Sequence, residues 1–333
     1  MAVYEESTIF KQLFNKAIDE AETICILGHT SPDGDCISSA LSVCTYIKNR
    51  NLIKGSKKAE VTVYLEEASE KFSYLHGFSD ICHDTDTGRN YDLSIVLDCG
   101  DISRLGKFSV YLKRAERSLC VDHHVTNEGF ADEALIVPKA SSTSELCFDL
   151  FEEDYIDKYA AEAVYTGLVH DTGVFRYSCT SPHTMEVAGR CMAFGIDFGM
   201  IIDDSFFSMS IVQKAVLGRV LSEMETALSG KLVIGHMDAK TMELYGVKNK
   251  DMDGMIDQLR TTRGAVGAAF LYQCPNRTYK LSLRSNSDEL NVAEIAAIFG
   301  GGGHVRAAGC FMGSDLRADI DRIIEEVRKR IGE

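Results

Sequence analysis

The first half of the chain alternates short apolar runs with helix-like stretches, and this alternation limits the possible folds more than any other feature. The apolar runs read as buried strands: 23–27 (TICIL), 61–65 (VTVYL), 93–97 (LSIVL) and 118–121 (SLCV). Stretches with helical spacing of apolar side chains lie between them, such as 36–49. Strands that alternate with helices predict an α/β domain with a mostly parallel sheet. In such sheets, ligands bind beyond the carboxyl ends of the strands.

The length of 333 residues suggests two domains. A second set of strand-like and helix-like stretches predicts a smaller C-terminal α/β domain: 231–237, 265–273 and 279–284 for strands, and 291–299 and 316–331 for helices. The stretch before them reads as largely helical. We therefore expect three parts, which are an N-terminal domain over 1–195, a helical connector over 196–228 and a C-terminal domain over 229–333.

The charge balance excludes one class of partner. Lys and Arg total 35 against 50 Asp and Glu, a formal net charge of −15, which argues against a basic face for long nucleic acid. A small anionic substrate stays compatible, because a bound metal ion reverses the field locally. The 11 Cys residues form no CxxC pair and several lie in apolar runs, as expected for free thiols in a reducing compartment. With no signal-peptide pattern and no long apolar run, we expect a cytoplasmic protein.

Acidic and histidine side chains stand where the predicted elements end. They are His29, Asp33 and Asp35 after the first strand, Asp98 after the third, Asp122, His123 and His124 after the fourth, and Asp171 at the end of a helical run. In a parallel sheet, the first three groups would emerge at one edge and face a common crevice. Taken singly, each Asp could be an ordinary turn former or helix cap. Their coincidence favours a functional site.

A shared pocket for these carboxylates requires a source of positive charge. Asp33, Asp35, Asp98 and Asp171 would repel one another, and several of their pKa values would be forced upward. Divalent cations remove this penalty, and carboxylate with imidazole donors suits Mn²⁺, with Mg²⁺ or another divalent ion as alternatives. The set is too large for one tetrahedral Zn²⁺ ion. It suits two ions about 3.5–4 Å apart, and Asp98 is the candidate bridge between them.

The pattern His29-x-x-x-Asp33-x-Asp35, followed by Asp98, by Asp122-His123-His124 and by Asp171, resembles motifs one to four of the DHH phosphoesterase family. The resemblance implies two Mn²⁺ ions, one held by His29, Asp33 and Asp98, the other by Asp35, Asp98, His123 and Asp171. It also implies that Asp122 orients its neighbours and that His124 lies beside the substrate phosphate. The catalytic candidates are thus Asp98, Asp122 and His124.

Arg284-Ser285 and the run from Gly300 to His304 resemble the substrate-binding domain that accompanies DHH domains. Consecutive glycines let the backbone approach an anion, although a glycine run alone is also typical of a turn. The resemblance implies a set of substrate-binding residues: Arg284, Ser285, Gly301, Gly302, Gly303 and His304. Arg104 is a further candidate, which could reach a phosphate or form an ordinary surface ion pair. The N-terminal domain would then be catalytic.

The motifs are most similar to those of the bacterial nanoRNases and adenosine 3′,5′-bisphosphate phosphatases. The resemblance implies a hydrolase of short oligoribonucleotides, two to five nucleotides long, or of adenosine 3′,5′-bisphosphate, in which metal ions activate the attacking water. A phosphodiesterase for cyclic or linear dinucleotides such as c-di-AMP and pApA stays open, and a non-catalytic nucleotide sensor is disfavoured because no expected ligand is missing. The expected partner is a small nucleotide or short single-stranded RNA, not a long duplex or a membrane. A homodimer is compatible with the resemblance.

Overall fold

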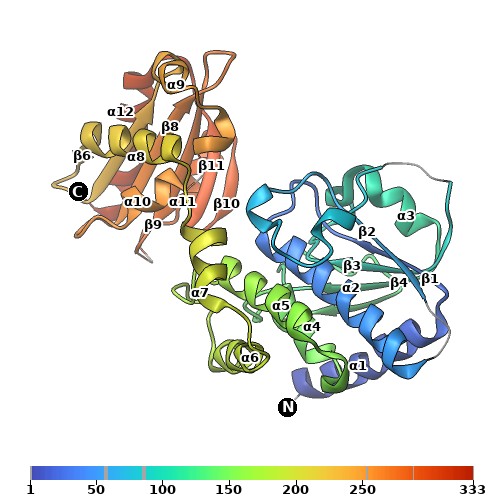
Figure 1. The fold of residues 1–333 in the computed structure, drawn as a ribbon. Coiled ribbons are helices and arrows are strands. Elements are labelled where there is room, and N and C mark those ends of the chain that lie inside the picture. Colours follow the sequence, from blue (N-terminus) through green and yellow to red (C-terminus); the bar gives the residue numbers. More distant parts are fainter. Residues whose placement is uncertain (1, 56–58, 85–87, 253, 288, 333) are drawn as a thin grey trace. The chain divides into compact units, whose positions relative to one another are not determined.

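A computed structural model describes residues 2–55, 59–84, 88–252, 254–287 and 289–332. The chain divides into two compact units, Met1–Ser208 and Met209–Glu333 (Figure 1). Each unit has its own hydrophobic core. The division falls inside the stretch expected to be a connector. None of the helices in the described residues combines the length and the apolar character needed to cross a membrane.

The first unit is built on a five-stranded sheet in which every neighbouring pair is parallel. Its order is β2-β1-β3-β4-β5, with the bounds Glu60–Tyr64, Thr23–Leu27, Tyr91–Leu97, Ala115–Asp122 and Glu133–Ile136. Side chains of β1 alternate between the faces: Ile24 and Ile26 join one core cluster, while Cys25 and Leu27 join another on the opposite side. The interior strands are therefore apolar on both faces, as parallel sheets require.

Helices cover both faces of this sheet (Figure 1). The larger layer contains α1 (Ala2–Glu20), α2 (Gly34–Lys54), α4 (Thr143–Leu150), α5 (Lys158–Asp171) and α6 (Pro182–Ala193). The opposite face packs against η3 (Ile102–Phe108) and α3 (Ser109–Lys113). The remaining short segments of the unit are η1 (Glu70–Phe72), η2 (Phe78–Asp80), η4 (Glu153–Tyr155), α7 (Phe198–Met200) and η5 (Ile201–Phe207).

The second unit contains a mixed six-stranded sheet with the order β10-β11-β9-β8-β7-β6. In that order the strands span Gly302–His304, Ala307–Phe311, Tyr279–Ser285, Gly267–Gln273, Leu232–Met237 and Glu225–Ala227. One face packs against α8 (Ile211–Glu223), α9 (Ala239–Tyr245) and α10 (Met255–Arg260), with η6 (Asn249–Met252) beside them. The other packs against α11 (Val292–Ile298) and α12 (Leu316–Ile331).

The predicted fold class is confirmed: a parallel N-terminal α/β domain precedes a smaller α/β domain with its own sheet. Sequence patterns missed the N-terminal helix α1 and several short strands, among them β5, β10 and β11. β10 consists of Gly302, Gly303 and His304, which carry no alternation of apolar and polar side chains. Its strand conformation comes from pairing with β11, a tertiary contact that no local pattern encodes.

Candidate functional site

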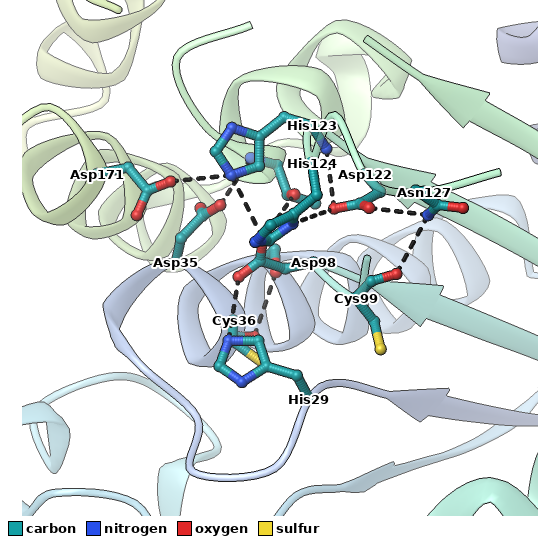
Figure 2. Close-up of polar contacts among 12 residues, drawn as sticks. His29, Asp35, Cys36, Asp98, Cys99, Asp122, His123, His124, Asn127 and Asp171 are labelled. Carbon is teal, nitrogen blue, oxygen red and sulfur yellow. Dashed lines mark hydrogen bonds and ion pairs between the residues drawn. The ribbon is translucent and has the colours of Figure 1, made fainter. Parts of the chain in front are cut away.

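The candidate site lies in the first unit at the carboxyl ends of β1, β3 and β4 (Figure 2). Asp98 directly follows β3 and is buried, with 2% of the residue exposed. Its Oδ2 atom lies 3.5 Å from His29 Nε2, and its Oδ1 atom lies 3.6 Å from His123 Nε2. Asp98 therefore stands between two histidines that follow different strands.

The loop after β1 supplies His29 and Asp33. His29 is buried, and its Nδ1 atom lies 2.8 Å from the carbonyl oxygen of Thr30, so Nδ1 carries the proton and Nε2 faces the carboxylates. Asp33 Oδ1 lies 3.7 Å from His29 Nε2 and also accepts hydrogen bonds from the amides of Asp35 and Cys36. Asp33 is thus both the N-cap of α2 and a neighbour of His29. Burial opposes protonation of His29, yet Asp33 and Asp98 raise its pKa.

Asp35 is fully buried and is held by the first turn of α4. Its Oδ2 atom accepts from the Thr143 amide at 2.6 Å, and Oδ1 accepts from the Ser144 amide at 3.0 Å. These are free N–H groups at a helix N-terminus, where the helix dipole favours a negative charge. Burial, followed by the charges of Asp171 and Asp98, nevertheless raises the pKa of Asp35 well above its usual value. A nearby cation would stabilise the ionised form of Asp35 and so offset the effect of burial and of the neighbouring negative charges.

His123 and Asp171 complete the other side of the cluster. His123 Nε2 lies 3.1 Å from Asp171 Oδ2, and Asp171 is the last residue of α5. Burial raises the pKa of Asp171 to about 6, with a further contribution from Asp98 against the lowering effect of His123. For His123, burial lowers the pKa, but the hydrogen bond that its ring donates to Asp171 and the negative charges of Asp35, Asp171 and Asp98 together outweigh burial and raise the value to about 10.

Asp122 organises the histidine pair without facing the cluster itself. It has no exposed surface, and its Oδ1 atom accepts from the His123 amide at 2.9 Å and lies 2.7 Å from His124 Nδ1. Its Oδ2 atom accepts from Asn127 Nδ2 at 2.8 Å (Figure 2). Burial opposes ionisation of Asp122, but the hydrogen bonds from His124 and Asn127 lower its pKa. With Nδ1 bound to Asp122, His124 is free to use Nε2 elsewhere.

Sequence reasoning missed the groups that support these candidates. Thr143 donates its hydroxyl to Asp98 Oδ1 at 3.1 Å, Asn127 also donates to the Cys99 carbonyl at 3.1 Å, and the Cys36 thiol lies beside His29. A signal existed for Thr143: Ser142 and Glu145 form the S-x-x-E pattern that marks a helix N-terminus. Ser142 indeed caps α4 by accepting from the Glu145 amide.

The donor atoms gather in three overlapping groups whose members lie within 4.8 Å of one another: His29, Cys36 and Asp98; Asp98, His123 and His124; and Asp35, His123 and Asp171. Among the described residues, no lysine or arginine forms an ion pair with Asp35, Asp98 or Asp171. Buried carboxylates with raised pKa values and imidazole neighbours fit divalent cations of the Mn²⁺ and Mg²⁺ type. The residues present therefore suit a metal centre.

The predicted substrate-binding residues, apart from Arg104, lie in the second unit. Ala307 pairs with His304 on one side and with Arg284 on the other, so these three side chains share one face of the sheet. Gly301, Gly302, Gly303 and His304 are exposed. A Cβ on Gly303, which has φ 147, would lie 2.5 Å from the Ala307 carbonyl oxygen, so glycine is required there. The Ser285 hydroxyl closes a local turn by donating to the Ser287 carbonyl at 2.7 Å.

Arg104 lies in η3 and is exposed, and the described residues form no ion pair with it. Its carbonyl oxygen accepts from the Thr30 amide at 2.7 Å. This bond ties the segment that carries Arg104 to the loop that carries His29. Arg104 is therefore near the candidate site through its backbone.

Family models match both units. The model for the N-terminal domain of the DHH family matches residues 23–168, and the DHHA1 domain model matches residues 237–333. A crystal structure described as an exopolyphosphatase-related protein from Bacteroides fragilis is 24% identical, covers 98% of each chain and has a TM-score of 0.88. This likeness establishes the shared fold.

Several curated relatives align with most of the chain. The bifunctional oligoribonuclease and PAP phosphatase NrnA of Thermus thermophilus is 28% identical over 92% of this chain and 90% of its own length. A probable NrnA of Streptococcus mutans is 27% identical over 96% of this chain and 98% of its own length. The cyclic-di-AMP phosphodiesterase PdeA of Listeria monocytogenes is 24% identical over 90% of this chain, but only 46% of PdeA is covered.

Proposed function

Because the chain belongs to the DHH family, we propose that it is a metal-dependent hydrolase of short oligoribonucleotides and of adenosine 3′,5′-bisphosphate. The observation that carries this proposal is the convergence of Asp35, Asp98 and Asp171 with three histidines in one largely buried cluster. The relatives named oligoribonuclease and PAP phosphatase align with most of this chain and support the same substrates.

The metal centre of this proposal contains two divalent ions, for which Mn²⁺ is the expected type and another divalent ion the alternative. One would be held by His29, Asp33 and Asp98, and the other by Asp35, Asp98, His123 and Asp171. When bound, such ions lower the pKa of a coordinated water and neutralise charge on the phosphoryl oxygens. The chain's own contribution is to keep the donors in place: the Thr30 carbonyl orients His29, and the α4 amides orient Asp35.

His124 is the residue that we assign to the substrate phosphate. Its Nδ1–H is directed at Asp122 Oδ1, 2.7 Å away, and Asp122 is fixed in turn by Asn127. When both ring nitrogens carry protons, Nε2–H can donate to a phosphoryl oxygen or to the leaving oxygen. The buried Asp122 carboxylate fixes the orientation of the ring.

The second unit carries most of the proposed substrate-binding residues. Arg284 and His304 share one face of its sheet, separated by the small side chain of Ala307, so a phosphate could be reached by both. Gly302 and Gly303, beside His304, are exposed on β10 at the edge of the sheet, whereas the Gly301 amide already donates to the Ala296 carbonyl at 2.8 Å. A basic pair of this kind suits the terminal phosphate of a short nucleotide, and Arg104 is a further candidate on the first unit.

A dinucleotide phosphodiesterase activity is the second candidate, because one relative is named a cyclic-di-AMP phosphodiesterase. Both activities need the same metal centre and differ in the bond that is cleaved. The deciding experiment measures Mn²⁺-dependent turnover of pApA, a five-residue RNA, adenosine 3′,5′-bisphosphate and cyclic di-AMP in parallel. We expect cleavage of the short RNA or of adenosine 3′,5′-bisphosphate, with slower turnover of cyclic di-AMP.

Variants make this experiment specific to the site. Asp98→Asn and His123→Ala should abolish turnover, because each removes a donor to the proposed centre. Glu128→Gln is the matched control, since it removes an exposed carboxylate close to the same motif and should leave turnover intact. Preferred cleavage of cyclic di-AMP would favour the second candidate. No turnover of any substrate by metal-loaded protein would refute both.

A further inference from the structure

Cys36 places a sulfur atom within the proposed metal centre, where neither the proposed ligand set nor the proposed reaction uses it. The residue lies in the first turn of α2, directly after Asp35, and is fully buried. Its Sγ atom, a ring nitrogen of His29 and a carboxylate oxygen of Asp98 all lie within 4.8 Å of one another. Figure 2 shows the thiol beside His29. Three potential donors of different chemistry therefore surround one position.

The packing around Cys36 keeps the sulfur in this position. A Cβ on Gly28 would lie 2.4 Å from Cys36 Sγ and 2.7 Å from Leu65 Cδ2, so only glycine at the end of β1 leaves room for the thiol. On its other side, the backbone amide of Cys36 donates to Asp33 Oδ1 at 3.2 Å. The same residue is thus tied to Asp33 by its backbone and faces His29 and Asp98 with its side chain.

We propose that Cys36 supplies a sulfur donor to the ion held by His29, Asp33 and Asp98, an inference that rests on the metal centre of the proposed function. Thiols coordinate as thiolates, so binding of the ion would release the thiol proton of Cys36 to the solvent. This position then offers one nitrogen, one sulfur and carboxylate oxygens. The other position, with Asp35, Asp98, His123 and Asp171, offers three carboxylates and one nitrogen.

The two positions should consequently prefer different ions. Thiolate is a soft donor and favours Zn²⁺, Co²⁺ or Fe²⁺ over Mg²⁺, whereas the carboxylate-rich position suits Mn²⁺ or Mg²⁺. A mixed-metal centre, with the softer ion beside Cys36, follows from this difference. The motif that carries the resemblance ends at Asp35, so the sulfur of Cys36 would add to the ligand set that the resemblance implies.

Cobalt gives a readout that does not depend on turnover. The full-length protein is freed of metal and reloaded with Co²⁺, and its absorption spectrum is recorded. We expect a near-ultraviolet thiolate-to-cobalt charge-transfer band, which disappears in Cys36→Ser and in Cys36→Ala. Cys99→Ser is the matched control, because Cys99 is also buried, adjoins Asp98, and donates its thiol to the Asp101 carbonyl at 3.2 Å. The charge-transfer band should persist in Cys99→Ser.

Two further measurements complete the test. The X-ray absorption spectrum of the cobalt-loaded wild type should be fitted only with a sulfur atom bound to cobalt. This measurement does not depend on whether a variant folds. Cys36→Ser should also lower the ratio of Zn²⁺ to Mn²⁺ affinity by about tenfold or more, on the scale of losing a supporting group at a metal site. Bound cobalt without a charge-transfer band or a sulfur neighbour would overturn the role of Cys36 and leave the proposed function standing. Absence of any stoichiometric Co²⁺ binding would overturn the metal centre itself.

Discussion

Asp98 has a left-handed backbone conformation, with φ 53, that residues other than glycine adopt rarely. Its amide donates to the Val121 carbonyl at 3.2 Å, which holds the turn at the end of β3 against β4. Such strain costs on the order of 1–3 kcal/mol and persists only when surrounding contacts enforce it. Here the unusual turn directs the carboxylate into the space between His29 and His123. The strain is therefore part of what forms the cluster.

Replacing Asp122 by Asn should reduce turnover more strongly than it reduces metal affinity. The carboxylate receives three hydrogen bonds, from the His123 amide, His124 and Asn127, and an amide can accept with only one of its two ends. We expect kcat to fall about 10–100-fold, as for other groups that orient metal-site residues. Steady-state kinetics and Mn²⁺ titration, run beside Glu128→Gln, separate the two effects. An unchanged kcat would contradict the orienting role.

Asp171 should make the metal-free protein less stable as the pH rises. Its pKa is raised to about 6, whereas the pKa of an Asp in the unfolded chain is about 3.9. Between these values the folded state binds more protons than the unfolded state, so the free energy of unfolding decreases with increasing pH. Metal-free Asp171→Asn should therefore gain stability relative to wild type between about pH 4 and about pH 6 and keep the gain above that.

Thermal melts of the two metal-free proteins across this range test the expectation. His170, whose burial lowers its pKa to about 3, acts in the opposite direction but is present in both proteins and largely cancels. Added Mn²⁺ should reverse the order in favour of wild type, because the ion replaces the proton as the partner of Asp171. A difference between the proteins that does not vary with pH would contradict the raised pKa.

At the scale of secondary structure, the N-terminus of α4 is the element that binds Asp35. The helix has eight residues, Ser142 caps it, and its first amides donate to the Asp35 carboxylate. α5 packs closely against this contact through Gly167: a Cβ there would lie 2.0 Å from Ser144 Oγ and 2.6 Å from Asp35 Oδ1. The approach of α5 to α4 thus depends on a residue without a side chain.

Gly167→Ala should therefore destabilise the protein and weaken metal binding together. Overpacking of this kind costs about 1–3 kcal/mol, and the displaced groups are the Ser144 side chain and the carboxylate of Asp35. Gly189→Ala in α6 is the matched control, since a Cβ there meets no atom within 4 Å. That variant should be stabilised by about 0.5–1 kcal/mol, as for an unhindered helical Gly to Ala change. Denaturant unfolding and Mn²⁺ titration of both variants provide the test. Equal stability and equal Mn²⁺ affinity of the two variants would contradict the expectation.

At the scale of the whole molecule, each unit has separate apolar clusters on the two faces of its own sheet. All of the proposed metal ligands belong to the first unit. Mn²⁺ at about a hundred times its Kd should stabilise that unit by about 2.7 kcal/mol, which raises its Tm by about 5–10 °C. Calorimetry should show this shift in the transition of the first unit, with the second unmoved. Asp98→Asn should abolish it, and equal shifts in both units would refute the assignment.

Local sequence patterns were sufficient for the α/β class and for the edge of the sheet where the site lies. Strands 23–27 and 93–97 are continuous apolar runs because both faces of a parallel strand are buried, and polar side chains follow where burial ends. The candidates His29, Asp33, Asp35, Asp98, His123, His124 and Asp171 could be selected for the same reason. Their roles as ligands stay predictions, although the structure brings them together.

Tertiary structure alone decided which groups support these candidates. Thr143 lies 45 positions from the Asp98 that it contacts, and its amide reaches Asp35 across 108 positions, distances over which no local pattern operates. The pairing of β10 with β11 and the left-handed turn at Asp98 likewise depend on neighbouring strands. The sequence by itself determined which polar side chains follow each strand, because the run of apolar residues that forms a buried strand is a local pattern. Only packing determined which distant amides, hydroxyls and thiols complete their surroundings.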